Sequence, residues 1–237
     1  MLELKGDILK PLILGRDIKK YKKEYKDRFL INSHNGQKGF AKRIDVEKDY
    51  PNIYSYLVRI DNESGGKVSN RTDKGYHWTN LRNCAFLDLF EKQKIVWPLT
   101  ADQWGYAIDN DCHYLTSGGF FLVSEKFSIR TLLVILNSKV LEFYFKFIGV
   151  MTAGGAFTLK KATIELLPIA KPESNLPFEN MADYMTFINS LGKYDNINPH
   201  VPNSHIAQLF EEVIDAMVME LYFKEAFEKS GIEFIKY

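Results

Sequence analysis

The chain has 237 residues, of which 46% are hydrophobic and 26% are charged, and its formal net charge is +1. This length and composition exclude disordered and fibrous proteins and indicate a globular chain that buries a core. Its two cysteines, Cys84 and Cys112, are too few for a disulfide framework or for a zinc site made of thiolates.

The first half of the chain alternates periodic segments with polar loops. Residues 15–29 predict a short helix with Ile18, Tyr21 and Tyr25 on one face. The other predicted elements up to residue 94 are a strand at 29–32, a helix opening near Pro51, a glycine- and serine-rich loop at 61–70 and a helix at 79–94.

The second half predicts short strands followed by helices. The predicted strands are 94–98, 104–109, 112–116, 119–124 and 164–172, with a glycine-containing loop at 149–162. The first predicted helix is capped by Ser128, is interrupted at 136–139 and ends near 148. Two more helices are predicted at 178–191 and 203–224.

These elements predict an α+β fold, with a mixed sheet body, packed helices and a C-terminal helical segment. We expect two domains, a body at 1–172 and an acidic helical segment at 173–237 that packs on the body or on a partner domain. The apolar segment 131–151 is interrupted by charged residues such as Lys139 and Glu142, so we expect a buried helix and not a membrane span. The opening segment is not typical of a signal peptide, and we expect a cytoplasmic protein.

Charge is distributed unevenly along the chain. Residues 173–237 carry 4 Lys/Arg against 11 Asp/Glu, whereas residues 1–172 carry 27 against 19. A basic body with an acidic tail is compatible with an anionic partner such as nucleic acid.

No motif for catalysis is recognisable. The sequence contains no phosphate-binding glycine loop, no G-x-S-x-G elbow and no H-E-x-x-H pair, and its five histidines are scattered. Asp17-Ile18-Lys19 has the bare D-x-K shape of some nucleases, but chance explains a match that short. We therefore expect no catalytic residues, no metal and no cofactor in this chain, with an unrecognised nuclease site as the alternative.

Three polar runs supply the side chains that nucleic-acid binding requires. Lysine and arginine contact phosphates, arginine and asparagine can read base edges, and aromatic rings stack on bases. The candidate DNA-binding residues are Arg16, Lys19, Lys20 and Lys23 in the lysine-rich segment, Arg71, Lys74, Tyr76, His77 and Asn80 in the segment 71–84, and Lys160 and Lys161 beside flexible glycines. Each run also has a purely structural interpretation. The lysine-rich segment could be a solvated helix face, the segment 71–84 a loop that holds a helix in place with Trp78 buried, and the segment with Lys160 and Lys161 a surface turn.

Long stretches of the chain resemble one family in order along the sequence. "LKPLILGRDIKKY", "FLINSHNG", "YPNIYSYL", "RTDKGYHWTNLRNCAFLDLFEKQKIVWP", "LLVILNSKVLEFYFK" and "IELLPIAKP" are similar to the TaqI-like C-terminal specificity domain of adenine-specific DNA methyltransferases and fused type II restriction–modification enzymes. The resemblance implies a target-recognition domain that reads a short sequence of double-stranded DNA. S-adenosylmethionine and magnesium would then belong to a methyltransferase or nuclease domain in cis or in trans. The abrupt start within the family's first run favours a fragment of a larger enzyme over a stand-alone subunit.

The resemblance also carries over to single residues. It implies that Asp17 caps a helix while Arg16 faces the DNA, with a structural Arg16–Asp17 pair as the alternative. It implies further that Arg82 holds a buried carboxylate and that Asn137 breaks a helix. The bases that the domain reads do not follow from it.

A rival hypothesis is that the chain is a protein-interaction subunit. The predicted helix 203–224 carries a wide apolar stripe that could dock a catalytic domain. The stripe consists of Ile206, Leu209, Phe210, Val213, Ile214, Met217, Val218 and Leu221.

Overall fold

Two serines are the N-caps of the two helices in the chain's most apolar segment. The Ser128 hydroxyl accepts from the backbone N–H of Thr131 at the start of α3 (Ile129–Asn137), and Ser138 accepts from Leu141 at the start of α4 (Lys139–Ile148). Between the helices, the buried Asn137 amide accepts from the Tyr106 N–H at 2.8 Å and donates to the Tyr106 carbonyl at 3.0 Å. The predicted break at Asn137 is confirmed.

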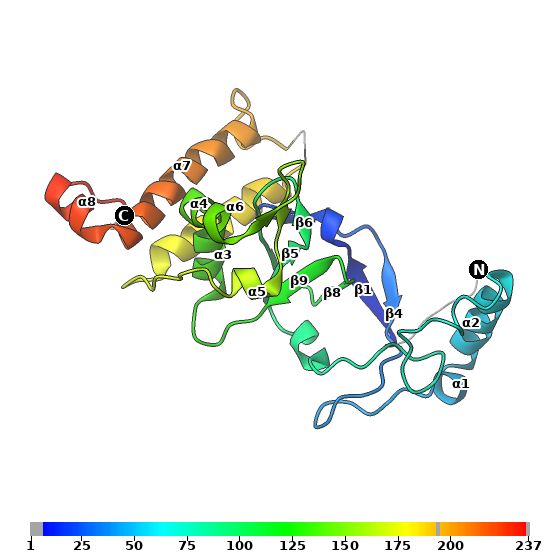
Figure 1. Ribbon diagram of the computed structural model, residues 1–237. Coiled ribbons are helices and arrows are strands. Elements are labelled where there is room, and N and C mark those ends of the chain that lie inside the picture. The colour runs from blue at the N-terminus through cyan, green and yellow to red at the C-terminus, as the bar shows by residue number, and fades with distance from the viewer. Residues whose placement is uncertain (1–6, 193–194, 236–237) are drawn as a thin grey trace. The chain divides into compact units, whose positions relative to one another are not determined.

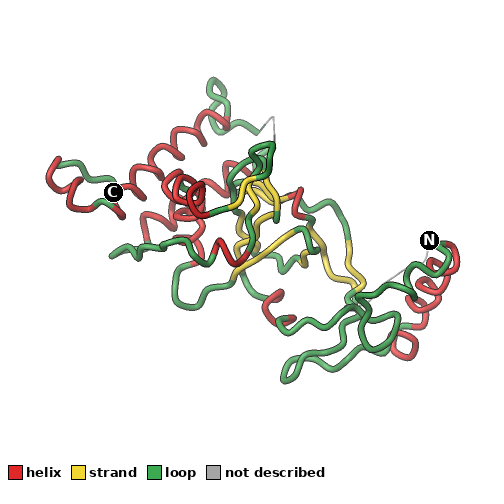
Figure 2. The backbone as a smooth tube through the Cα atoms, viewed as in Figure 1, coloured by secondary structure: helices red, strands yellow, loops and turns green. Residues whose placement is uncertain are grey.

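The computed structural model describes residues 7–192 and 195–235, and its helices and strands confirm the α+β class. By packing, the described residues form two units. The first unit comprises 7–12, 27–92 and 112–114, and the second comprises 13–26, 93–111, 115–192 and 195–235. Helices concentrate in the second unit, whereas long loops make up much of the first (Figure 2).

The first unit combines a small sheet with two helices. Its strands are β1 (Leu9–Ile13), β4 (Phe29–Ile31) and β8 (Tyr114–Leu115), in the order β4-β1-β8. Ile8, Val46 and Ile53 form its apolar core. The helices are α1 (Val46–Asp49), α2 (Pro51–Glu63) and the 3-10 helix η2 (Leu87–Glu91), and α2 begins at Pro51 as predicted.

The second unit is built around the buried strand β5 (Lys94–Pro98), which pairs antiparallel with β7 (Ala107–Asp109) and β9 (Gly119–Leu122). A second sheet has the order β10-β11-β6, from β6 (Thr100–Ala101), β10 (Val150–Met151) and β11 (Phe157–Thr158). The remaining helices are α5 (Lys161–Ile164), α6 (Leu176–Ser190), α7 (Asn203–Tyr222) and α8 (Lys224–Ser230) (Figure 1). The predicted helices at 178–191 and 203–224 are thus α6 and α7, which pack on each other and on α3 and α4.

The helix predicted at 15–29 is wrong. This segment forms a 3-10 turn, η1 (Gly15–Asp17), followed by a hairpin of β2 (Ile18–Lys19) and β3 (Lys22–Lys23). Tyr21 sits in the hairpin turn with a φ of 58°, a left-handed conformation that no α-helix contains. A helix here would also have placed lysines one turn apart, where like charges repel.

Two further predictions at the level of elements are wrong. Residues 79–86 form no helix, because the buried Thr79 and Asn80 are held in an irregular loop. Residues 164–172 form no strand. Pro168 and Pro172 in this stretch lack the N–H that a sheet ladder needs. The loop predicted at 149–162 contains the β10–β11 hairpin and the start of α5.

Over the described residues, no helix has both the length and the apolar character that a membrane crossing requires.

Candidate nucleic-acid interface

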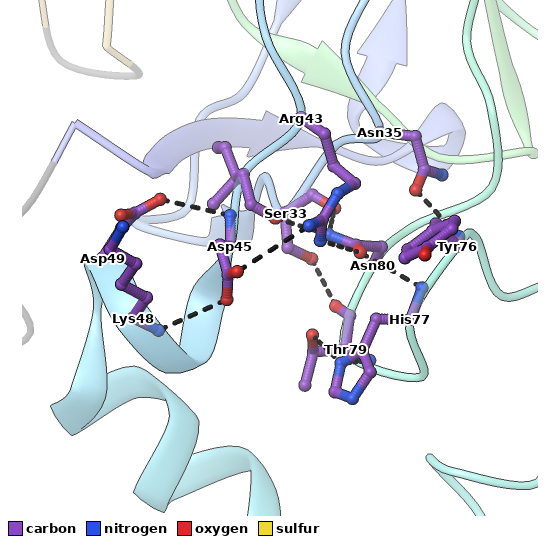
Figure 3. A network of polar contacts seen from close by, with 11 residues as sticks. Ser33, Asn35, Arg43, Asp45, Lys48, Asp49, Tyr76, His77, Thr79 and Asn80 are labelled. Atoms are coloured by element: carbon purple, nitrogen blue, oxygen red, sulfur yellow. Dashed lines mark hydrogen bonds and ion pairs between the residues drawn. The ribbon is translucent and has the colours of Figure 1, made fainter.

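Two loops of the first unit lie side by side and are fastened to each other by the buried side chain of Asn80. We call them the paired loops, residues 33–44 and 71–83. The Asn80 amide donates to the carbonyls of Ser33 at 3.1 Å and Ile44 at 2.9 Å (Figure 3). The Leu81 N–H donates to Ser33 O at 3.0 Å. Asn80 is fully buried, so its amide is committed to the fold and has no surface from which to read a base.

Asn35 makes a second connection between the paired loops. Its carbonyl accepts from the Tyr76 N–H at 2.9 Å and its amide donates to the Leu81 carbonyl. A side chain at Gly75 would overlap with both Asn35 and the Leu81 carbonyl. Glycine is therefore needed here for the loops to approach each other, and not for the close approach of a ligand.

Arg71 also serves the loop architecture. Its guanidinium donates to the carbonyls of Asn80 and, at 3.4 Å, of Trp78. Its buried Nε atom has no hydrogen-bond partner in the part of the chain that the structure describes. Arg71 is half-buried, and His77 is likewise half-buried with its Nδ1 2.9 Å from the Thr79 hydroxyl. Arg71 and His77 therefore contribute hydrogen bonds that stabilise the loop.

Exposed side chains on the paired loops gather around a hollow of about 480 Å³. Tyr76 is 85% exposed, and the guanidinium of Arg43 lies 4.9 Å from the centroid of its ring. The other residues that line the hollow are Asn35, Lys74, Gly75 and Asn83. An aromatic ring, a guanidinium and two amides facing one hollow offer both stacking and hydrogen bonding to a flat polar ligand such as a base.

The charge of the paired loops suits an anionic partner. Residues 33–44 carry three Lys/Arg and no Asp/Glu, and residues 64–86 carry four against one. Lys74 is exposed, and its ammonium group donates to the Ser69 carbonyl at 2.9 Å. Lys38 and Lys42 are exposed as well.

Residues 36–43 form a projecting turn, the Phe40 hairpin, that the sequence analysis missed. Gln37 and Ala41 close it by pairing, and the Gln37 amide donates to Asp88 at 2.6 Å. Gly36 and Gly39 have φ values of 86° and 80°, which glycine adopts without strain. The signal was present in "HNGQKGFAKR", where glycines alternate with lysines and no acidic residue occurs.

The candidates in the lysine-rich segment belong to the second unit and divide into two kinds. Arg16 and Lys19 are exposed and have no ion pair among the described residues. Lys20, by contrast, pairs with Glu211 at 2.8 Å, and Lys23 pairs with Asp109 at 3.2 Å and Asp111 at 2.5 Å. Lys20 and Lys23 therefore have acidic partners for their charges.

Lys160 and Lys161 follow the β10–β11 hairpin and are exposed. Lys161 pairs with Glu165, one helical turn away on α5, at 3.5 Å, and both side chains are mostly in solvent. Such a pair is weak and leaves Lys161 available. We predict that the candidates from the three runs converge on a single DNA-facing surface. Because they divide between two packing units, this stays a prediction.

The residues carried over from the resemblance have mixed outcomes. Asp17 is buried and closes η1 by accepting from the Leu14 N–H at 3.3 Å, while Lys26 pairs with it at 3.1 Å. The Asp17 carboxylate thereby raises the pKa of Lys26. Arg82 is exposed and pairs with no buried carboxylate among the described residues.

The buried carboxylate of Asp109 is already neutralised. It lies 2.7 Å from the buried Lys94 ammonium as well as near Lys23. A metal at Asp109 would have to compete with two cations, so the chemistry around this acid does not favour one. The absence of a cofactor site stays a prediction.

Loops that present cationic, amide and aromatic groups on a fixed scaffold are typical of a recognition domain. Comparison with known families gives this class a name: the model of the TaqI-like C-terminal specificity domain matches residues 10–169. The match spans more than half of the chain, and the chain belongs to this family. It is thus a DNA sequence-recognition domain of restriction–modification systems, a class that associates with a catalytic domain. No curated protein matches the chain.

Proposed function

We propose that the paired loops of the first unit form the surface that reads a short sequence in double-stranded DNA. The observation that carries this proposal is the hollow bounded by Arg43, Tyr76 and Asn83, on loops that Asn35 and Asn80 hold in place. Preorganised side chains lose little conformational entropy on binding, so they can discriminate between bases. Lysines on the same loops supply the sequence-independent attraction to phosphate.

The exposed cations of the second unit extend this proposal. Arg16, Lys19, Lys160 and Lys161 are free to contact phosphates, whereas Lys20 and Lys23 are engaged with acids. We assign these four residues to backbone contacts and not to base reading, because lysine grips phosphate as a point charge and carries little sequence information.

We further propose that the catalytic partner is an adenine-specific methyltransferase domain or a fused nuclease, acting with this domain in the cytoplasm. In that arrangement S-adenosylmethionine and magnesium are bound by the partner. The docking role of α7 is a weaker proposal, since Ile214, Met217 and Val218 of its stripe are buried within the second unit. Leu209 and Val213 are the exposed stripe positions on which it rests.

A selection from randomised duplexes tests the proposal for the paired loops. We expect the full chain to enrich a short common sequence at low salt. Arg43→Ala should then weaken binding to the selected duplex by about 1–3 kcal/mol and relax the preference at one or two positions. Enrichment of no sequence, or an Arg43→Ala variant that binds and discriminates like the wild type, would contradict the proposal.

The chain supplies a matched control for Arg43. Arg59 on α2 is also exposed, belongs to the same unit and stacks on a tyrosine, with its guanidinium 5.4 Å from the Tyr56 ring centroid. Arg59→Ala removes the same charge outside the paired loops, and the pair of Arg59 with Glu63 at 3.8 Å matches the pair of Arg43 with Asp45 at 3.7 Å. Arg43 differs in one further contact, a 3.4 Å hydrogen bond to the Asn80 Oδ1 atom. We expect it to leave sequence preference unchanged.

A further inference from the structure

The Phe40 hairpin carries a large aromatic side chain that is about half exposed. Phe40 is 51% exposed at the turn that Gln37 and Ala41 close. The half of its surface that stays in water contributes little to the stability of the fold. At the tip of the turn, this ring is available to contact a partner.

The hairpin is held firmly at its base. The Gln37 N–H donates to the Ala41 carbonyl at 2.8 Å, and the Ala41 N–H donates back to Gln37 at 3.0 Å. A second clamp joins Gln37 to Asp88 through two hydrogen bonds, at 2.6 and 3.3 Å. A turn held in this way can keep its conformation when a side chain at its tip contacts a partner.

The charges around Phe40 indicate what kind of partner this is. Lys38 and Lys42 lie two residues to either side, and both are exposed. Two flanking ammonium groups are unfavourable for burial in an apolar protein groove but match the phosphates on either side of a base step. DNA-bending proteins insert phenylalanine between neighbouring base pairs in this setting.

We infer that Phe40 is a wedge that inserts between stacked base pairs next to the recognised sequence, while Lys38 and Lys42 contact the flanking phosphates. The inference rests on the proposed DNA-reading function, but it concerns a different step. The paired loops discriminate bases at the hollow, and Phe40 unstacks and unwinds the duplex beside them.

Relaxation of a closed circular plasmid by a topoisomerase, in the presence of the full chain, measures this unwinding. A wedge untwists the duplex, so we expect plasmid relaxed with the wild type and then freed of protein to have a lower linking number than plasmid relaxed alone. Phe40→Ala should abolish this shift at matched occupancy and weaken binding roughly tenfold. Phe40→Leu, which keeps an apolar wedge, should retain part of the shift.

Controls separate this inference from the proposed function. Phe147 on α4 is 74% exposed, and Phe147→Ala removes a ring outside the hairpin that is more exposed than Phe40; it should leave the shift intact. Wild-type protein that binds the plasmid without shifting its linking number, or a Phe40→Ala variant with an undiminished shift, would overturn the wedge while leaving DNA recognition in place. A chain that binds no DNA would instead remove the proposed function.

A tryptophan at the tip gives a second readout that does not depend on unwinding. Trp97 and Trp104 are buried, whereas Trp78 is half-buried on the paired loops, so the tip is followed as the difference in emission between Phe40→Trp and the wild type, each measured with and without the duplex. Stacking between bases should quench that added emission when a short duplex is bound. Unchanged emission on a bound duplex would place the ring outside the base stack.

Discussion

Asn80 and Asn83 are of one type and close in sequence, but they have different roles. One holds the two loops together, and the other lies on the surface that the loops present. Asn80 is fully buried and bridges two loops, whereas Asn83 is exposed and lines the hollow. Residue type and spacing predicted that this stretch binds a ligand, but neither gives the direction in which a side chain points. That direction depends on contacts with residues 33–44, which are distant in the sequence.

Substitution of these two asparagines separates the roles. Asn80→Ala leaves the Ile44 carbonyl without its donor and should lower the free energy of unfolding by about 1–3 kcal/mol. Asn83→Ala should change stability by less than about 0.5 kcal/mol but weaken DNA binding. Urea unfolding and duplex titration of both variants measure the difference, and the opposite assignment of effects would contradict these roles.

The protonation of His34 makes the stability of the first paired loop, residues 33–44, depend on pH. Its Nδ1 accepts from the Gly36 N–H at 3.0 Å, and burial together with the nearby positive charge of Lys10 lowers its pKa from the usual 6.5. The folded state therefore favours the neutral ring. The stability that His34 contributes is fully present above the unfolded pKa and is lost as pH falls through the folded pKa.

We expect the wild type to lose stability relative to His34→Gln as pH is lowered from about 7 to about 5. Urea denaturation of both proteins over this range provides the test. Parallel curves for the two proteins would show that His34 does not titrate between the folded and unfolded states.

At the scale of elements, the sequence predicted the segments that carry local helix signals and failed on the lysine-rich one. α3 and α4 have serine caps, α2 and α6 have a proline in the first turn, and α7 has apolar residues at helical spacing. The β2–β3 hairpin was not predictable, since the turn at Tyr21 is stabilised by its N–H bond to the distant Tyr106 carbonyl at 2.8 Å. The Phe40 hairpin depends on Asp88 in the same way.

Two glycines of the Phe40 hairpin should respond differently to alanine. A Cβ at Gly36 would meet the Ala41 carbonyl and the Arg43 N–H, each at 2.8 Å, whereas a Cβ at Gly39 meets no atom within 4 Å. Both have positive φ, so Gly39→Ala costs about 1 kcal/mol of local strain and Gly36→Ala costs more. Amide hydrogen exchange across 37–43 should rise more in Gly36→Ala; equal exchange in the two variants would contradict the packing described here.

At the scale of the whole molecule, the basic character of residues 1–172 is concentrated on loops that hold few acids. The chain passes back and forth between its two packing units, so composition along the sequence does not show this division. The α+β class was predictable from the pattern of elements, and the family was predictable from long runs of similarity. The exposed residues around the hollow required the three-dimensional contacts.

Binding of duplex DNA should weaken steeply with salt, because each neutralised phosphate releases a counterion. Lys42→Ala should reduce the slope of log affinity against log salt by about one. Lys48→Ala is the matched control, because Lys48 is exposed in the same unit but lies on α1; its slope should equal that of the wild type. Equal slopes for all three proteins would exclude a phosphate contact by Lys42.

The position of the DNA on the chain can be measured by photocrosslinking to a selected duplex that carries iodinated pyrimidines, followed by mass spectrometry of the linked peptides. We predict crosslinks to Tyr76 and to peptides from the paired loops, residues 33–44 and 71–83. Crosslinks confined to α7, or to the second unit as a whole, would contradict the claim that these loops read DNA.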